Sequence, residues 1–427
     1  MKQTPFWIDS ADPFPDRSGK PLPESADVVV IGGGLTGLST ALHAARKGAR
    51  VVLVEKTRVG SGASARNGSM CTQGLPIGLG TARRRYGEQR TRELYDAYRI
   101  AVDVVEELTM SEGIDCDFHR AGRLGVAFKP AHFEAQKAAA RDLAASFGHE
   151  TVLLSRAELR AELGSDYYHG ALLDPLSAGL HVGKYVAGMA AAAERHGAQV
   201  HEQTPATAAR RRPGGGFEVL TTRGPVVAEQ VMVATDAYSD GAFGWLRKQL
   251  VCVGSFIVVT EPLGADRARA LIPRGRMVVD SKNVGHYIRL TPDNRLMFGG
   301  RARFAPSNPA SDRKSGAVLR REMTEIFPQL SDVRIDYCWG GSVGFSYDRM
   351  PHAGTHDGMY YVNGYCGHGV QMATYMGRCM AEAMDGHPEA NPLRGLPESR
   401  VPVPFYNGTA WFLPFAGAYY RAKDKFC

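Results

Sequence analysis

The stretch VVVIGGGLTGLSTALHAARKGARVVLVE, residues 28–55, decides the fold. The apolar run at residues 28–31 is typical of a strand buried on both faces of a parallel sheet. It leads into the pattern Gly32-x-Gly34-x-x-Gly37, then into a helical pattern and a second apolar strand at residues 51–54 that ends at Glu55. Strand, glycine loop, helix, strand and acid occur in the order of a dinucleotide-binding unit, so we predict a Rossmann-like nucleotide site here.

Each of these residues has a mechanical role in the predicted site. Gly32 permits the tight turn, Gly34 lets a pyrophosphate approach the backbone, and Gly37 lets the helix pack closely on the strand. The phosphates then face the positive end of the helix. Glu55 is placed to accept hydrogen bonds from ribose hydroxyls, and its charge argues against the 2′-phosphate of NADP. The alternative is a glycine-rich turn that binds no ligand.

Length, composition and charge limit the classes to which the protein can belong. A chain of 427 residues exceeds one ordinary core, so two domains are expected. The net charge of +7 is mild, and the short arginine runs at 83–85 and 210–212 lack interleaved aromatic residues, which argues against nucleic-acid binding. No segment is long and apolar enough for a membrane span, and no hydrophobic signal core is evident, so a cytoplasmic protein is expected. The seven cysteines show no metal-binding spacing, so free thiols and no metal site are expected.

The pattern along the chain predicts an α/β protein whose nucleotide-binding domain is assembled from separated segments. A strand at residues 358–362 leads into Gly364–Gly369 and a helix to about residue 384, which repeats the strand, glycine loop and helix of the start. A β-sheet-rich second domain is expected to be inserted between them. The expected segments are a leader extended over the surface at 1–25, the nucleotide-binding domain at 26–85, 170–245 and 337–390, a substrate domain at 86–169 and 246–336, and a tail docked on the core at 391–427.

Further motifs resemble the D-amino-acid-oxidase-like superfamily of FAD-dependent amine oxidoreductases, in the same order along the chain. They are VGSGASARNG at 59–68, IDCD at 114–117, GALLD at 170–174, RLTPDNRL at 289–296, FPQL at 327–330, IDYCWG at 335–340, GYCGHG at 364–369 and PFAGAYY at 414–420. Because function resides in sites rather than in folds, the resemblance supports a shared fold more strongly than a shared substrate.

The resemblance implies a two-domain flavoprotein that oxidises a C–N bond by passing hydride to flavin N5, after which the imine hydrolyses to a carbonyl and an amine or ammonia. The expected activity is an oxidase of a primary or secondary amine, such as a polyamine derivative or an N-alkyl amino acid, with O2 as acceptor and hydrogen peroxide as product. Two alternatives stay open. One is an amine or D-amino-acid dehydrogenase of the same fold that passes electrons to a quinone or another carrier, and the other is a non-catalytic flavoprotein. The oligomeric state is left open.

The resemblance also assigns the residues that contact the cofactor. The first strand–helix–strand unit holds the ADP half, and the loop after it runs beneath the pyrophosphate and flavin, where backbone donors and small side chains suit a flat ring. A later strand meets the adenine, and two strand ends and a helix start complete the site. The residues are Gly32, Gly34, Leu35, Thr36, Gly37, Glu55 and Lys56; Ser61, Gly62, Ala63, Ser64, Arg66, Asn67 and Gly68; Ala206 and Thr207; Ala234, Thr235 and Gly340; and Gly364, Tyr365, Gly367, His368, Gly369 and Val370. Asp236 stands where the family often has a glycine after Ala-Thr.

The helix that begins near Gly369 is expected to support the reduced flavin. Reduced flavin carries negative charge around N1 and the C2 carbonyl, and a helix N-terminus carries about half a positive charge. A protonated His368 would add to that charge. The alternative is a His368 that only hydrogen-bonds its surroundings.

The substrate side departs from the amino-acid members of the family. Val343 stands where those members have an arginine that clamps the substrate carboxylate, so α-amino acids are expected to be poor substrates. Candidate replacements, each also open to a structural role, are Arg289, Arg301, Arg303 and Arg349. The predicted substrate residues are Met70, Phe256, His286, Tyr287, Phe345, Ser346 and Tyr365. Ordinary core packing is the alternative for each.

No general base is evident, and His368, Tyr287 and Met297 are the candidates for catalytic positions. Sarcosine-oxidase relatives carry a lysine near N5 that promotes reaction with oxygen and a cysteine that tethers the flavin. Met297 stands at the lysine position and Gly341 at the cysteine position, so non-covalent FAD is expected. A neutral amine can give up hydride without an enzymic base, because burial in an apolar pocket lowers the amine pKa.

Overall fold

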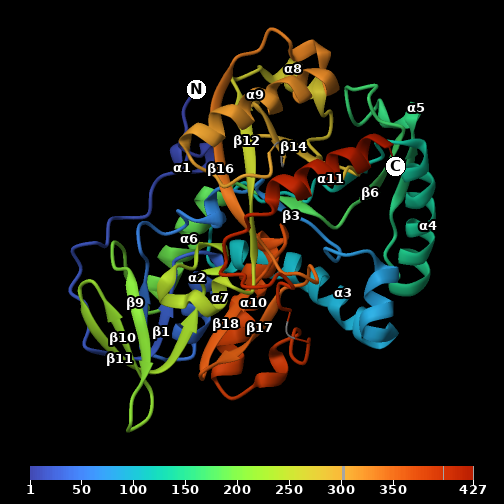
Figure 1. The fold of residues 1–427 in the computed structure, drawn as a ribbon. Helices are drawn as coiled ribbons and strands as arrows, with labels where there is room; N and C mark the ends of the chain where they lie inside the picture. The colour runs from blue at the N-terminus through green and yellow to red at the C-terminus, as the bar shows by residue number, and fades with distance from the viewer. Residues whose placement is uncertain (301–302, 398, 427) are drawn as a thin grey trace.

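The stretch at residues 28–55 forms strand β1 (Ser25–Ile31), helix α2 (Leu35–Arg46) and strand β2 (Val51–Val54), as predicted (Figure 1). The structure is a computed structural model, and it describes residues 1–300, 303–397 and 399–426. β1 and β2 pair in parallel. Because successive side chains of a strand point to opposite faces, Val28 and Val30 pack with α2 while Val29 and Ile31 pack in a separate core. Both faces are therefore covered, which explains the unbroken apolar run.

The first sheet has eight strands drawn from distant parts of the chain. Its main path follows the order β17–β18–β11–β1–β2–β8, and β10 and β9 extend from β11 as an antiparallel arm (Figure 1). Its other strands are β8 (Gln199–His201), β9 (Ala206–Arg211), β10 (Phe217–Thr221), β11 (Gly224–Val233), β17 (His352–His356) and β18 (Met359–Asn363). β11 is parallel to both β1 and β18, so these strands share one carboxyl edge, where ligands bind in open α/β sheets.

Helices from three parts of the chain cover one face of the first sheet. α2 packs against α6 (Val182–Arg195) and α10 (Gly369–Met384), and α10 packs against α3 (Leu79–Ser111). Their apolar sides share one buried cluster with β1. The remaining helices are α1 (Phe6–Asp9), α4 (Pro130–Phe147), α5 (Arg156–Leu159), α7 (Gly244–Arg247), α8 (Ala265–Leu271), α9 (Pro309–Ile326) and α11 (Leu413–Phe426), with short 3-10 turns η1 (Ala63–Ala65), η2 (Asp236–Tyr238), η3 (Gly241–Phe243), η4 (Pro328–Leu330) and η5 (Pro388–Ala390).

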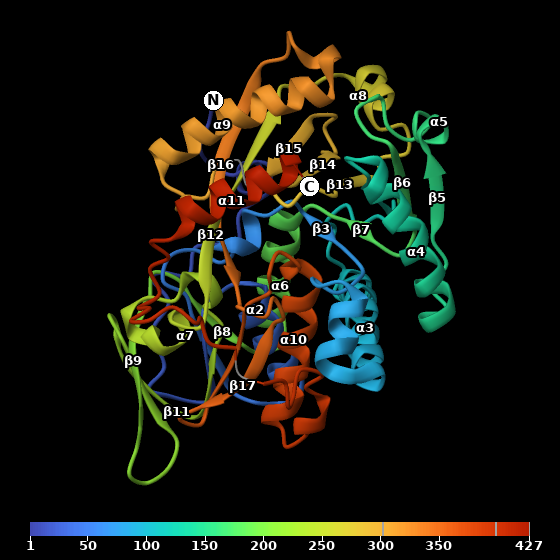
Figure 2. The same ribbon diagram turned by 45° about the vertical axis from the view of Figure 1, so that its right-hand side comes forward.

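The second sheet also has eight strands, in the order β16–β12–β15–β14–β13–β4–β6–β5 (Figure 2). Its outer face packs on α9, which contacts β16, β12 and β15. Residues of β4, β12, β13, β14 and β16 line a cavity shared with the first sheet. The strands are β4 (Arg123–Val126), β5 (Val152–Ser155), β6 (Gly170–Asp174), β12 (Val251–Thr260), β13 (Met277–Asp280), β14 (His286–Leu290), β15 (Leu296–Gly300) and β16 (Ile335–Phe345); β3 (Met70–Cys71) and β7 (Ala178–Gly179) form a separate pair.

The predicted fold class is confirmed: an α/β protein with a Rossmann-like unit and a second, β-rich region. Two segments lie elsewhere than expected. The sequence assigns β6 and most of β16 to the nucleotide-binding domain, yet β6 pairs with β4 and β5, and β16 pairs along β12 in the second sheet. A buried strand is an apolar run in either sheet, so long-range contacts, rather than its own pattern, decide its partner.

The N-terminal segment at residues 1–25 is exposed or half-buried over most of its length, but three aromatic side chains anchor it to the core. Phe6 and Trp7 of α1 are buried, as is Phe14. The Trp7 indole donates a hydrogen bond of 2.9 Å to the carbonyl of Asn67. The many Pro, Asp and Ser residues of this segment suggested an exposed chain, but three buried aromatic side chains outweigh them because each removes a large apolar area from water.

The C-terminal segment contacts the second sheet through α11, which crosses the upper part of the molecule in Figures 1 and 2. Leu413 is buried in a small cluster with Val253 and Phe304. The Asp424 carboxylate accepts hydrogen bonds of 2.8 Å from the backbone N–H groups of Asn283 and Val284. Within the described residues, no helix is long and apolar enough to cross a membrane.

Candidate active site

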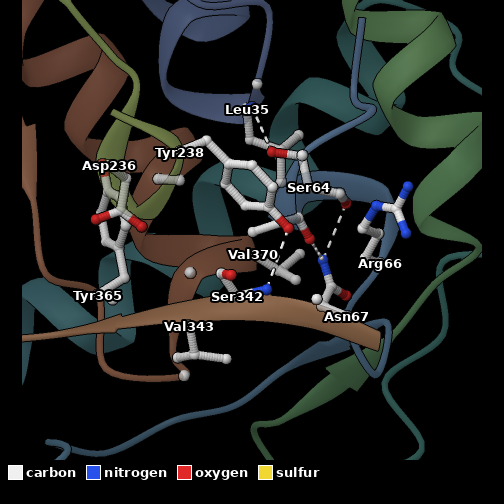
Figure 3. A pocket seen from close by; sticks show the side chains of 18 of the residues that line it. Leu35, Ser64, Arg66, Asn67, Asp236, Tyr238, Ser342, Val343, Tyr365 and Val370 are labelled. Atoms are coloured by element: carbon white, nitrogen blue, oxygen red, sulfur yellow. Dashed lines mark hydrogen bonds between the residues drawn. The ribbon is translucent and has the colours of Figure 1, made fainter. Parts of the chain in front are cut away.

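One cavity of about 720 Å³ is lined by residues of both sheets (Figure 3). Its size is that of a site for a large organic ligand. Most of the predicted cofactor residues line it together. They are Gly32, Gly34, Leu35, Thr36, Glu55, Lys56, Ser61, Gly62, Ala63, Ser64, Arg66, Asn67, Gly68, Ala206, Ala234, Thr235, Tyr365, Gly367, His368, Gly369 and Val370.

The turn between β1 and α2 brings the start of α2 to the cavity. Gly32 has a positive φ of 109°. A Cβ atom on Gly37 would lie 1.9 Å from the Gly32 carbonyl oxygen, so any other residue there would push the helix off the turn. Gly37 thus acts through packing and does not line the cavity. A Cβ atom on Gly34 would lie 2.9 Å from Ser64 Oγ, which itself accepts a hydrogen bond of 3.0 Å from the Leu35 N–H (Figure 3).

Glu55 is held at the cavity wall by backbone donors. Its Oε2 accepts a hydrogen bond of 2.7 Å from the Gly33 N–H, and its Oε1 accepts one of 2.8 Å from the Thr57 N–H. Oε1 also accepts a hydrogen bond of 3.2 Å from Thr57 Oγ1. Because each carboxylate oxygen has two acceptor sites, Oε2 keeps the capacity to accept from a ribose hydroxyl. This geometry fits the ribose of an adenine dinucleotide.

The glycine-rich loop at residues 60–68 is braced by its own side chains. Asn67 Nδ2 donates to the carbonyls of Ala63 (3.0 Å) and Ser64 (2.9 Å) (Figure 3). Arg66 donates to the carbonyls of Ser61 (2.8 Å) and Gly340 (3.2 Å), which links the loop to β16. The Asn67 amide and the Nε and Nη1 atoms of Arg66 are therefore engaged within the protein, and these contacts fix the shape of the loop.

The start of α10 points unsatisfied backbone donors at the same cavity. No side chain caps this helix start, and the first N–H groups of a helix have no partner within it. Gly367, Gly369 and Val370 line the cavity there. Tyr365 is held beside them by a hydrogen bond of 2.6 Å between its OH and Thr36 Oγ1. The arrangement suits a ligand that carries partial negative charge.

His368 lies beside the start of α10, and burial disfavours a charged imidazolium there. Burial lowers the pKa of His368 to about 4, and the positive charges of Arg123 and Arg349 act in the same direction. Its Nδ1 is buried and has no hydrogen-bond partner within the described part of the chain. An orphaned ring nitrogen beside a helix start is consistent with a ligand that supplies the missing partner.

Asp236 joins the end of β11 to the turn before α10. It has a positive φ of 39°, and its Oδ1 accepts a hydrogen bond of 2.7 Å from the Gly364 N–H. Burial raises the pKa of Asp236 to about 6. The Asp236 side chain lines the cavity, whereas Gly364, whose N–H makes this contact, does not.

Tyr287 presents a ring to the cavity from β14. A Cβ atom on Gly299 would lie 2.1 Å from that ring, and one on Gly68 would lie 2.9 Å from it, so both glycines make room for it. The Tyr287 OH and Ser255 Oγ are 2.9 Å apart and share a hydrogen bond. Met70 and Phe345, two other predicted substrate residues, line the cavity as well.

Several predicted residues lie outside the cavity lining. Phe256 is fully buried against α9, because β12 turns Ser255 inward and Phe256 outward. Met297 is likewise buried, in the core beside Tyr287. Ser346 Oγ donates to the Met350 carbonyl at 2.7 Å. Gly340 does not line the cavity, although its neighbour Gly341 does. Thr207 does not line it either and lies on β9.

His286 lines the cavity, but both of its ring nitrogens are engaged. They lie 2.8 Å from Asp280 Oδ2 and 3.0 Å from Glu322 Oε2. Burial opposes the charge of the ring, yet these two hydrogen bonds raise the pKa of His286 to about 9. The ring is therefore protonated at neutral pH and donates to both carboxylates, so its role is structural.

Lining residues that the sequence did not reveal come from loops and from the second sheet. Tyr238 follows β11, and its OH accepts a hydrogen bond of 3.2 Å from the Ser342 N–H (Figure 3). Arg123, Ser255, Val279 and Lys282 line the wall formed by the second sheet. Their strands gave no motif, and only sheet pairing brings them to the cavity.

Comparison with known proteins identifies the family to which these features belong. The family model described as FAD dependent oxidoreductase matches residues 27–383. A probable oxidoreductase OrdL of Haemophilus influenzae is 34% identical over 86% of this chain and 84% of its own length. The γ-glutamylputrescine oxidoreductase of Escherichia coli is 33% identical over 94% of this chain and 93% of its own. The crystal structure of glycine oxidase from Geobacillus kaustophilus superimposes with a TM-score of 0.72 at 20% identity, over 88% of this chain and all of that one. The resemblance predicted from the motifs is confirmed.

Proposed function

This chain belongs to the family of FAD dependent oxidoreductases, and from that premise we propose that it is an oxidase of a primary or secondary amine. The observation that supports the proposal is one cavity with two kinds of wall. One wall carries the Glu55 carboxylate and the starts of α2 and α10, and the other carries Tyr287 and Met70. Bound FAD supplies the hydride acceptor, and the relative from E. coli bears the name of an amine oxidoreductase.

The residues of this chain fit FAD in three respects. Glu55 offers an anchored acceptor to a ribose, the α2 start offers N–H groups to a pyrophosphate, and the α10 start offers N–H groups to a ring that gains negative charge. The neutral His368 has a ring nitrogen to offer the same ligand. These groups bind, orient and stabilise the cofactor, and none of them needs to move a proton.

Tyr287, Met70 and Phe345 supply an apolar surface on the substrate side. Such a surface disfavours an ammonium ion and lowers the pKa of a bound amine. The neutral amine then carries the lone pair that assists departure of hydride from the neighbouring carbon. A dedicated base is not required, and His286 could not serve as one because it is already protonated.

The proposed attachment of FAD is non-covalent. Among the described residues that line the cavity, Cys366 is the only cysteine, and burial raises the pKa of its thiol to about 11. A thiol that stays protonated is a poor nucleophile. Acid precipitation should therefore release all of the FAD into the supernatant; flavin that remains with the pellet would contradict this assignment.

A second candidate is a dehydrogenase that passes electrons to a quinone or another carrier. The observation that favours it is Met297, which stands where sarcosine-oxidase relatives carry an oxygen-activating lysine and is buried in the core. Both candidates predict that an amine reduces the bound FAD, and they differ in the rate of reoxidation.

The experiment is anaerobic titration of the FAD-loaded protein with a panel of amines, followed by admission of air. The panel contains γ-glutamylputrescine, putrescine, sarcosine, N-alkyl amino acids, glycine and D-alanine. We expect bleaching by a primary or secondary amine and rapid recolouring with formation of peroxide. Bleaching with slow recolouring would favour the dehydrogenase, and bound FAD that no amine bleaches would overturn the proposal.

A further inference from the structure

We propose that Arg123 binds an anionic group of the substrate, a carboxylate remote from the carbon that is oxidised. The inference rests on the proposed function for the amine end and deepens it by naming a substrate class. It begins at the clamp position, where Val343 lines the cavity and offers no donor to a carboxylate. An acidic substrate would then need a cation elsewhere on the cavity wall.

The arginines expected to replace the clamp are engaged elsewhere. Arg289 is buried, and its Nη1 donates to the carbonyls of Ser69 and, at 3.0 Å, Leu180. Arg303 and Arg349 do not line the cavity, and Arg301 lies outside the described residues. Of the described arginines, only Arg66 and Arg123 line it, and Arg66 is bound to the carbonyls of Ser61 and Gly340.

Arg123 has donors that the protein does not satisfy. It lies on β4, opposite Asp174 of β6, and its Nη2 is 3.7 Å from Asp174 Oδ2. That carboxylate already accepts hydrogen bonds from Ser177 Oγ (2.7 Å), the Leu176 N–H (2.9 Å) and His149 Nε2 (3.2 Å). Arg123 Nε is buried and has no hydrogen-bond partner among residues 1–300, 303–397 and 399–426. A guanidinium presents its donors as a rigid fork that matches a carboxylate, so the unmet donors define a specific ligand chemistry.

The charges on this wall act in the same direction. Lys282 also lines it, and its ammonium lies 4.1 Å from the centre of the Phe128 ring. Asp280 lines it too, but its carboxylate is paired with the protonated His286. Glu322 binds the other face of that ring from α9 and does not line the cavity. Arg123 and Lys282 are thus lining cations that have no carboxylate within hydrogen-bonding distance among the described residues, which favours an amine with a distant carboxylate over a polyamine that is cationic at both ends.

The test compares ligands that differ only in this anionic group. Succinate, glutarate and adipate are titrated against their diamides, and the change in flavin absorbance of the FAD-loaded protein reports binding without turnover. We expect the best diacid to bind about 100-fold more tightly than its diamide, because a site with unmet polar donors strongly rejects a ligand that lacks the matching group. In Arg123→Gln this preference should fall to about threefold or less. Arg160→Gln is the matched control: Arg160 is exposed, pairs with Asp166 and lies outside the cavity lining.

The same comparison is then made during reduction. The wild-type protein and both variants are mixed anaerobically with N-glutarylputrescine and with the corresponding carboxamide. Arg123→Gln should lose the preference for the carboxylate and reduce with the carboxamide as fast as wild type. Equal binding of diacids and diamides by the wild-type protein, or an undiminished preference in Arg123→Gln, would overturn the inference. If the diacid preference depends on Arg123 but no amine bleaches the flavin, the anion site stands and the proposed function fails.

Discussion

At the scale of single residues, the cofactor site depends on positions that have no room for a side chain. Gly34 is the position at which a pyrophosphate is expected to approach the turn, and a Cβ atom there would also lie 2.9 Å from Ser64 Oγ. We predict that Gly34→Val abolishes FAD retention, measured as the ratio of flavin to protein absorbance after purification. Gly19→Val is the control, since nothing lies within 4 Å of a Cβ atom at Gly19. A Gly34→Val protein that purifies with full FAD would refute the assignment.

Asp236 gives a second prediction at the residue scale, in the dependence of stability on pH. Burial raises the pKa of Asp236 from 3.8 to about 6, so the folded state binds this proton more tightly than the unfolded state does. Its contribution to stability is therefore greatest below pH 3.8 and is lost as the pH rises through 6. Asp236→Asn keeps an acceptor for the Gly364 N–H but cannot ionise. In urea unfolding of the FAD-free protein, we expect the variant to gain up to about 3 kcal/mol relative to wild type as the pH rises across this interval. If the free energies of unfolding of wild type and Asp236→Asn changed in parallel with pH, Asp236 would not be buried as a neutral acid.

At the scale of elements, neighbouring residues of β12 should affect different properties. Phe256 is fully buried against α9, whereas Ser255 bonds the Tyr287 OH at the cavity. We predict that Phe256→Ala lowers the free energy of unfolding by about 3–5 kcal/mol and leaves the rate of flavin reduction unchanged. Ser255→Ala should cost about 1 kcal/mol of stability and slow flavin reduction, because it loosens the Tyr287 ring. The two measurements are urea unfolding and anaerobic reduction by one amine. If Phe256→Ala slowed flavin reduction while Ser255→Ala mainly lowered stability, the assignment of faces in β12 would be wrong.

Phe256 was predicted to face the cavity but packs against α9. This error shows why the two faces of a strand were hard to tell apart from the sequence. Residues 256–260 are all buried, so β12 has no alternation there to show which side chains face the cavity. The β1–α2–β2 unit was predictable for the opposite reason. Its glycines and Glu55 have fixed spacings, and each spacing follows from a local steric or hydrogen-bonding need.

At the scale of the whole molecule, the cavity is assembled from segments that are distant in sequence. Motifs with internal geometry, such as the loop at 60–68 and the turn at 364–369, could be placed from sequence together with the fold class. Arg123, Lys282 and Tyr238 could not, because they reach the cavity only through the pairing of β4 with β13 and through loops after β11 and β13. The burial of Trp7 was missed for a related reason: its partners are the Asn67 carbonyl and side chains of the distant α6 region.

The central claim is that this one cavity holds FAD and an amine together, so that the amine reduces the FAD. The most direct test is a single anaerobic turnover, in which loss of flavin absorbance and release of carbonyl product are measured in the same sample. The account predicts complete bleaching by a primary or secondary amine, with carbonyl product formed in equal amount to the bound FAD. FAD that stays oxidised with every amine of the panel, or that bleaches without forming carbonyl product, would contradict it.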